Sequence, residues 1–185
     1  MAPSGLCHLR LVRRLVPTPS DQVDLVEAYA PPEPPVDRPF VRCNMISSID
    51  GAIAVEGRSG MLGGPADRRV FATLRSLADV ILVGAGTVRA EGYGPARFGD
   101  ELRAARVGRG LHHVLGEGGP GLNAELVQAE LLDELCLTMA PRMVGGAGPR
   151  VLAGEELAPP VDLELVQLLE EDGFLFYRLR LPRRG

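Results

Sequence analysis

Aromatic residues are scarce in this sequence, and charge of one sign is only weakly in excess. The chain of 185 residues has no tryptophan, three tyrosines and five phenylalanines, which disfavours a surface that recognises bases or sugars by stacking. The formal net charge of −4 gives no support to nucleic-acid binding. No apolar run approaches the length of a membrane span, and arginines interrupt the apolar residues near the N-terminus. We therefore expect a cytoplasmic protein without nucleic-acid or membrane partners.

Cysteine is also scarce, and its spacing excludes two further classes. Cys7, Cys43 and Cys136 are an odd number without a CxxC pair, which is typical of a reduced chain with buried thiols rather than of a disulfide scaffold. No local signature supports a catalytic Cys–His pair, and no His/Cys cluster has metal-ligand spacing. We therefore expect no metal site.

The remaining composition is that of an ordinary globular protein, with 45% hydrophobic and 24% charged residues. The run Pro31-Pro32-Glu33-Pro34-Pro35 predicts an extended spacer, because proline cannot continue a helix or a central strand. We expect an N-terminal part over residues 1–37, with a strand at 9–16 and a short helix capped by Ser20. The main domain would cover residues 38–185.

Hydrophobic periodicity after the spacer predicts an α/β domain. The predicted strands are residues 40–46, 52–55, 79–83, 111–115, 134–139, 163–169 and 174–181. The predicted helices are one that begins at Gly64-Pro65 and one over residues 122–129. Strand–helix–strand order favours parallel pairs, and the Asp172-Gly173 turn predicts a final hairpin. The expected fold is a mixed, mostly parallel sheet flanked by helices, with a β-hairpin at the C-terminus.

Two strand-to-helix junctions carry small residues. Gly116-Glu117-Gly118-Gly119-Pro120 follows one apolar stretch, and Gly84-Ala85-Gly86-Thr87 follows another. Backbone N–H groups can approach a phosphate at such junctions because no side chain intervenes. The two junctions predict a nucleotide cofactor, and the lone Glu117 suggests a proton to be moved.

Four pieces of the sequence together resemble the pyrimidine-reductase family of riboflavin biosynthesis, which is the C-terminal reductase domain of the bifunctional deaminase-reductases. The pieces are Asn44-Met45-Ile46-Ser47-Ser48-Ile49-Asp50-Gly51; Leu74-Arg75 with Ala78-Asp79; Val83-Gly84-Ala85-Gly86-Thr87-Val88; and Glu117-Gly118-Gly119-Pro120 with Leu132-Asp133-Glu134-Leu135 and Ala140-Pro141. The resemblance covers most of residues 38–146 and implies a dihydrofolate-reductase-like fold. It also implies a homodimeric oxidoreductase that transfers hydride from NADPH to a small heterocycle, 5-amino-6-ribosylaminouracil 5′-phosphate. No zinc motif of a deaminase accompanies it.

The resemblance also implies the residues of the site. Glu117 is the catalytic candidate and a substrate contact, because a carboxyl group in a glycine-walled pocket could hold or protonate the group opposite the incoming hydride. Asn44, Ser59 and Arg75 are further substrate contacts, and Arg75 could grip a phosphate with two hydrogen bonds. The implied cofactor contacts are Ser47, Met61, Gly84, Gly86, Thr87, Glu91, Gly118, Gly119, Pro120, Gly121, Leu122 and Asn123.

Several of these residues also have plain structural interpretations. Thr87 could cap the helix that follows it, and Glu91 could be a solvated helix charge. Arg75 could form an ordinary surface salt bridge. Asp50 is expected to close its Asp-Gly turn rather than to take part in chemistry.

The sequence departs from the family at two places. Asn44 stands where family members commonly carry lysine, and asparagine can hydrogen-bond but brings no positive charge. This leaves open a dihydrofolate-reductase-like activity on a pterin or folate, which would demand an acid near the pterin. Residues 94–110 are too few for the strands, helix and 2′-phosphate loop of the family, which leaves open a non-catalytic nucleotide-binding or oligomeric relative. The arginines that could replace the lost contacts, or form a solvated basic segment, are Arg97, Arg103, Arg106 and Arg109.

Overall fold

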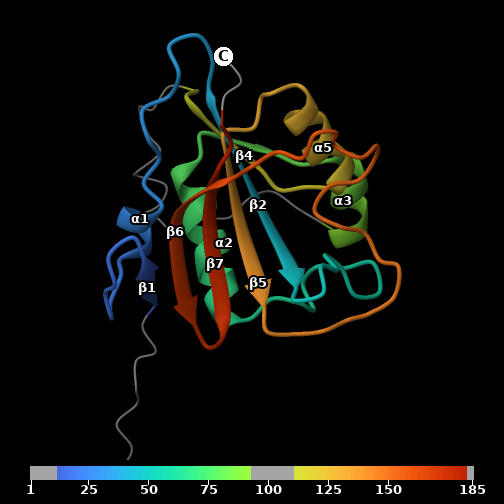
Figure 1. The fold of residues 1–185 in the computed structure, drawn as a ribbon, viewed down its shortest axis with the longest axis horizontal. Helices are drawn as coiled ribbons and strands as arrows, with labels where there is room; N and C mark the ends of the chain where they lie inside the picture. The colour runs from blue at the N-terminus through green and yellow to red at the C-terminus, as the bar shows by residue number, and fades with distance from the viewer. Residues whose placement is uncertain (1–11, 93–110, 183–185) are drawn as a thin grey trace, which may run out of the picture.

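The computed structural model describes residues 12–92 and 111–182, which form one mixed seven-stranded sheet with helices on both faces (Figure 1). The strands are β1 (Arg13–Val16), β2 (Phe40–Ser48), β3 (Val80–Leu82), β4 (His113–Gly116), β5 (Glu134–Ala140), β6 (Glu164–Glu171) and β7 (Phe174–Arg180). The helices are α1 (Leu25–Ala28), α2 (Pro65–Leu77), α3 (Ala85–Glu91) and α5 (Pro120–Gln128). Their order across the sheet is β1-β6-β7-β5-β2-β4-β3.

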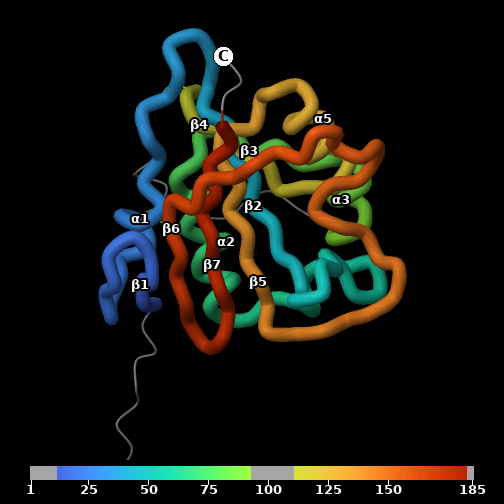
Figure 2. The backbone as a smooth tube through the Cα atoms, viewed as in Figure 1, coloured from blue at the N-terminus to red at the C-terminus, as the bar shows by residue number. Residues whose placement is uncertain are grey.

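The sheet has a parallel half and an antiparallel half. Strands β3, β4, β2 and β5 run parallel, with Asn44 of β2 opposite Cys136 of β5. Strands β7, β6 and β1 continue the sheet in antiparallel order, and the hairpin of β6 and β7 lies beside the N-terminal strand (Figure 2). Asp172 and Gly173 turn the hairpin with φ of 53° and 81°. The predicted parallel pairs and C-terminal hairpin are therefore confirmed.

Each face of the sheet is covered by a helix with an apolar side. Helix α2 begins with Gly64 as N-cap and Pro65 in its first turn, and it buries Val70, Leu74 and Leu77 in the larger core. Helix α5 packs on the other face, where Leu126 joins Val41 and Cys43 of β2. Because β2 is covered on both sides, its sequence is an almost continuous buried run rather than an alternation.

The segment before the proline run is part of the same sheet. Strand β1 pairs with β6, and Tyr29, which is 1% exposed, lies in the larger core. The predicted cap of the short helix is wrong. Asp24 is the N-cap and accepts a hydrogen bond from the Glu27 amide at 3.0 Å, whereas the Ser20 hydroxyl donates to the Gln22 carbonyl. Aspartate and serine cap helices equally well, so the residue types could not decide between them.

Two other local predictions are corrected by the structure. Residues 52–55 do not form a strand: Val55 makes only an isolated bridge with Arg58, and the Ile53 amide donates to the Pro149 carbonyl at 3.2 Å. Thr87 is not a cap, because it lies inside α3, whose N-cap is Gly84. The remaining strands and helices fall within a few residues of their predicted bounds.

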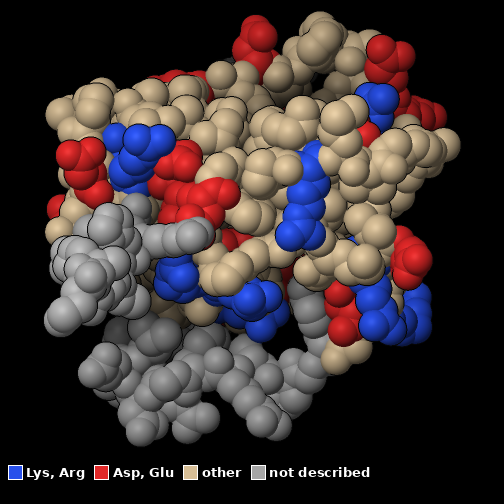
Figure 3. Space-filling model, turned by 90° about the horizontal axis from the view of Figure 1, so that it is seen from below, with Lys and Arg blue, Asp and Glu red and all other residues tan. Residues whose placement is uncertain are grey.

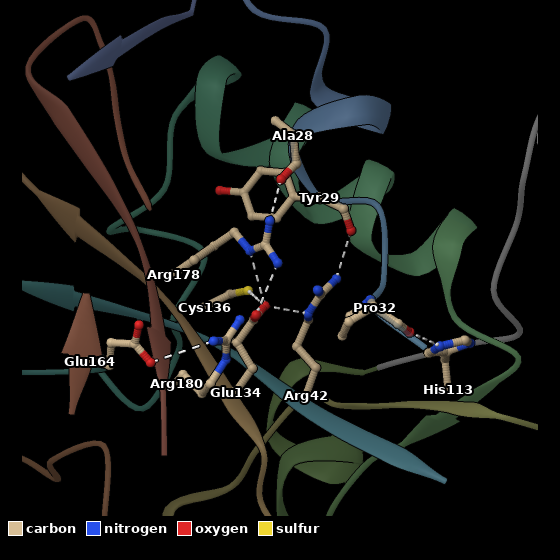
Figure 4. Close-up of polar contacts among 10 residues, drawn as sticks. All are labelled: Ala28, Tyr29, Pro32, Arg42, His113, Glu134, Cys136, Glu164, Arg178 and Arg180. Carbon is tan, nitrogen blue, oxygen red and sulfur yellow. Dashed lines mark hydrogen bonds and ion pairs between the residues drawn. The ribbon is translucent and has the colours of Figure 1, made fainter. Parts of the chain in front are cut away.

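A buried ion cluster connects the N-terminal segment to the sheet (Figure 4). Glu134 of β5 lies between Arg42 Nε, at 2.7 Å, and Arg178 Nη2, at 3.0 Å. The two guanidinium groups also donate to the carbonyls of Tyr29 and Ala28. Burial alone would raise the pKa of Glu134, but the two arginines outweigh it and hold that pKa below its ordinary value. Sequence patterns gave no sign of this cluster, because its members are far apart along the chain.

Candidate active site

A cavity of about 620 Å³ opens at the carboxyl ends of β2, β3 and β4. This volume is within the range of small-molecule and cofactor sites. The predicted site residues that line it are Asn44, Ser59, Gly84, Gly86, Thr87, Glu91, Glu117, Gly118, Gly119, Pro120, Gly121 and Leu122. Seen from the edge where the arrows of β2 and β5 end, uncharged surface separates small groups of acidic and basic side chains (Figure 3).

The two glycine junctions lie against each other at the wall of this cavity. The Gly84 amide donates to the Gly118 carbonyl at 2.7 Å, and the Glu117 amide donates to the Leu82 carbonyl at 2.9 Å. A Cβ atom at Gly84 would lie 3.0 Å from the Gly119 nitrogen and 3.2 Å from the Gly118 oxygen. The absence of a side chain at Gly84 therefore permits this backbone contact. The peptide bond between Gly118 and Gly119 is cis.

Glu117 forms a bidentate ion pair with Arg75. Arg75 Nε donates to Oε1 at 2.6 Å, and Nη2 donates to Oε2 at 2.5 Å. The Glu117 side chain is 1% exposed, and the Arg75 guanidinium also lies 4.1 Å from the centre of the Phe71 ring. The sequence indicates both residues as site candidates but does not indicate that they pair. Arg75 does not line the cavity, and the hydrogen bonds expected to grip a substrate phosphate go to Glu117 instead.

Ser59 and Glu91, which were predicted for different ligands, are bonded to each other. Glu91 Oε1 accepts from the Ser59 amide at 2.7 Å and from its hydroxyl at 2.8 Å. These bonds join α3 to the loop that follows β2. These two hydrogen bonds therefore hold the Glu91 carboxylate at the cavity wall, so that Glu91 is not simply a solvated charge on the helix.

Three predicted cofactor contacts lie outside the cavity lining and remain predictions. Ser47 is buried and borders a shallow, separate pocket beside Asp50. Met61 is 52% exposed, and its carbonyl accepts from Arg142. Asn123 is buried, and its side-chain amide donates to the Val151 carbonyl at 3.0 Å. The four arginines between residues 94 and 110 that were considered for the 2′-phosphate lie outside the described residues.

Asp50 does more than close its own turn. Its carboxylate accepts hydrogen bonds from the Ser48 hydroxyl at 2.5 Å and from the Gly145 amide at 2.6 Å. These bonds, the Ser48 hydroxyl first, lower the pKa of Asp50 to about 2. Asp50 thus ties the end of β2 to the loop that follows β5.

Sequence patterns gave no indication that one face of α2 borders the cavity. Asp67, Arg68 and Phe71 line it. Asp67 is half-buried, and burial raises the pKa of its carboxyl although a hydrogen bond from the Thr138 hydroxyl opposes the change. The Gly64-Pro65 pattern predicts only that a helix begins there. The signal that could have identified it was an acid and an arginine side by side next to the buried stripe.

The described residues contain no group of three or more His, Cys, Asp or Glu side chains that could hold a metal ion. Cys43 and Cys136 are buried free thiols, as expected, and burial raises the pKa of Cys43 to about 12.

None of the helices in the described ranges combines the length and apolar character that a bilayer crossing needs.

Comparison with known proteins finds similarity to chains that are named as reductases. In an alignment 214 positions long, gaps included, the chain is 24% identical to the 2,5-diamino-6-ribosylamino-4(3H)-pyrimidinone 5′-phosphate reductase of Methanothermobacter thermautotrophicus, covering 77% of this chain and 99% of the relative. A pyrimidine reductase-like protein of Corynebacterium diphtheriae superposes with a TM-score of 0.73 at 19% identity, covering 79% of this chain and 93% of that one.

Dihydrofolate reductase of Enterococcus faecalis superposes with a TM-score of 0.50 at 15% identity, covering 78% of this chain and 97% of that one. The expected dihydrofolate-reductase-like fold is thus confirmed. The model of the RibD C-terminal domain family matches residues 39–106 and 97–173, which together are more than half of the sequence. The chain therefore belongs to the RibD C-terminal domain family.

Proposed function

We propose that this protein is an NADPH-dependent reductase that transfers a hydride to a ribosylaminopyrimidine 5′-phosphate in riboflavin biosynthesis. One observation carries the proposal: both glycine junctions and the buried Glu117 border the same cavity. A nucleotide held by the junctions would therefore share that space with a substrate held near Glu117. The name of the archaeal relative supports the substrate class, and the choice of NADPH and of a homodimer comes from the family resemblance.

The glycine junctions fit a dinucleotide. Helices α3 and α5 both begin after a glycine N-cap that gives no side-chain capping bond. The first amides of α5 can therefore face a phosphate. We propose Gly84, Gly86, Thr87 and residues 118–122 as the groups that hold the cofactor. NADPH bound there would supply the hydride, and the protein would position it and exclude water.

The substrate side would be formed by Glu117, Arg68 and Asn44. An ion-paired carboxylate with two hydrogen bonds from Arg75 is better suited to accept a substrate N–H or O–H than to give up a proton. Arg68 is exposed and lines the cavity, so it is the proposed phosphate anchor in place of Arg75. Asn44 Oδ1 is buried without a hydrogen-bond partner among the described residues, and we propose that it accepts from the substrate.

A second candidate is a dihydrofolate-reductase-like activity. Asp67 is the observation that favours it, because a pterin would require an acid in the cavity and this acid lines it. The two candidates share the cofactor and differ in the substrate.

The proposal is tested first by titrating the purified protein with NADPH and NADH and following nicotinamide fluorescence. We expect saturable binding that prefers NADPH. Oxidation of NADPH is then measured with the ribosylaminopyrimidine 5′-phosphate and with dihydrofolate in separate reactions. Turnover of the first alone supports the main proposal, and turnover of dihydrofolate alone supports the second. Absence of nucleotide binding would favour the non-catalytic alternative.

A further inference from the structure

Asn123 lies just beneath the cavity wall, and both polar ends of its side chain are engaged. It follows the first turn of α5 and is 1% exposed. Its Oδ1 accepts a hydrogen bond from the Cys43 thiol of β2 at 3.5 Å, and its Nδ2 donates to the Val151 carbonyl at 3.0 Å. The main-chain amide of the same residue donates to the Gly119 carbonyl at 3.1 Å. Asn123 therefore joins three parts of the protein, which are the glycine loop, the sheet and the loop that follows β5.

The loop that follows β5 is bonded to the start of α5 at a second point. The Ala153 amide donates to the Pro120 carbonyl at 3.1 Å, whereas the bond to Val151 comes from the Asn123 side chain. Main-chain amides inside a helix are used by the helix itself, so a side-chain amide is the donor that α5 can offer to a carbonyl beside it. Pro149, in the same loop, lines the cavity. The contact thus joins α5 to a segment of the cavity wall.

The sheet side of this connection is closely packed. A Cβ atom at Gly116 would lie 2.7 Å from the Cys43 sulfur, so the end of β4 leaves that thiol little room to move. Burial raises the pKa of Cys43 to about 12, so the sulfur keeps its proton and stays a donor. The carbonyl end of Asn123 is therefore held against a fixed atom of β2, while its amino end holds the loop.

We propose that Asn123 is a positioning residue that fixes the first turn of α5 where its amides can reach the phosphate of the nucleotide. The inference rests on the proposed function, because it assigns how the phosphate-binding turn is held. Pro120, Gly121 and Leu122 line the cavity, and Asn123 does not. It acts on the nucleotide through these neighbours, in place of the direct contact that the family resemblance implies. A displacement of about 1 Å can cost about 100-fold at an oriented site, so the loss of one such bond should be measurable.

The test compares Asn123→Ala with Cys43→Ala. The first variant removes both side-chain bonds, whereas the second removes only the thiol bond and leaves the loop attached. Asn123→Ala should raise the Kd and the KM for NADPH about tenfold, because the Val151 carbonyl loses its donor, and leave kcat within about threefold of the wild type. Cys43→Ala truncates a core residue and lowers stability, but it should leave the Kd for NADPH within about threefold. Glu125→Gln, at an exposed position of α5, is the second control.

Hydrogen exchange of the Ala153 amide, followed by NMR on the full chain, tests the geometry without a ligand. In Asn123→Ala this amide should exchange about tenfold faster relative to the Val41 amide. The Val41 amide donates to Asp133 Oδ2 at 2.9 Å in the buried sheet and reports on global opening. In Cys43→Ala the ratio of the two rates should stay at its wild-type value.

Two results would overturn the inference: an unchanged exchange ratio in Asn123→Ala, or an equal loss of NADPH affinity in Cys43→Ala. If the wild type binds no NADPH, the proposed function fails, and the exchange ratio still decides whether Asn123 holds the turn. If Asn123→Ala does not fold, the wild type decides. Its Asn123 side-chain amide protons should exchange slowly and shift when NADPH is added, and fast exchange or an unshifted resonance would contradict the inference.

Discussion

The pairing of Glu117 with Arg75 changes what each side chain can do. Alone, Glu117 would be a buried acid near a glycine loop, and Arg75 would be a cation available to a phosphate. Together they form a bidentate ion pair in which Arg75 donates to both carboxylate oxygens. Removing the charge of one partner leaves the other without compensation in a poorly solvated place. The unit therefore fixes a hydrogen-bond acceptor beside the Gly118-Gly119 loop.

The substitution Glu117→Gln tests this role. The side-chain volume is preserved and the Glu117 amide keeps its bond to Leu82, so the affinity for NADPH should stay within about threefold of the wild type. Loss of the charged acceptor should lower kcat by at least about 100-fold, as the loss of one fixed hydrogen-bonding group does at other active sites. Nicotinamide fluorescence and steady-state kinetics give the two quantities, with Glu125→Gln as the control. Loss of NADPH binding in a folded Glu117→Gln protein would remove Glu117 from the substrate side.

At the scale of elements, the geometry of the site depends on how closely the carboxyl ends of β3 and β4 can approach each other. The Gly84–Gly118 hydrogen bond holds the two strand ends together, and α3 and α5 start from that point. A Cβ at Gly84 would lie so close to the Gly118 and Gly119 backbone that this backbone would have to shift by a few tenths of an ångström, and a backbone moves aside less easily than a flexible side chain. The relative position of the two helix starts therefore depends on this glycine.

Gly84→Ala should push these strand ends apart. We expect a loss of about 1–3 kcal/mol in the free energy of unfolding, typical of overpacking, and at least a tenfold weaker affinity for NADPH. Gly86→Ala is the matched stability control, because nothing lies within 4 Å of an added Cβ there. Alanine in α3 should leave the stability unchanged or raise it by up to about 1 kcal/mol. Urea unfolding gives both values, and equal stabilities of the two variants would contradict the role of the contact.

The elements could be predicted from the sequence where local signals are strong. The contacts between residues far apart along the chain could not. The apolar stripe of α2, the run of β2 and the Asp172-Gly173 turn are local features, and each formed as expected. The glycine junctions were likewise visible, because glycines that follow an apolar run mark the end of a strand, although glycines of an ordinary turn leave the same pattern. Two contacts of α2 depend on how the helix lies across the sheet. One joins it to the loop after β4, and the other joins Asp67 to Thr138. Neither contact leaves a periodic trace in the sequence.

At the scale of the whole molecule, the N-terminal segment and the sheet share one interior. The proline run separates them along the chain, but Arg42 and Arg178 donate to the carbonyls of Tyr29 and Ala28 while holding Glu134. Those carbonyls accept hydrogen bonds from guanidinium groups that are themselves buried. Because unpaired buried charges are costly, we expect the segment and the sheet to unfold together.

Tyr29→Ala and Val26→Ala test this cooperativity at two positions of the same short segment. Tyr29 is 1% exposed and Val26 is 48% exposed. Truncating the buried ring should cost about 3–5 kcal/mol, whereas truncating the exposed valine should change stability by less than about 0.5 kcal/mol. Urea unfolding followed by far-ultraviolet circular dichroism measures both. A single transition that shifts strongly only in Tyr29→Ala would indicate one folding unit. A small shift, or a separate early transition, would mean that the N-terminal segment folds apart from the sheet.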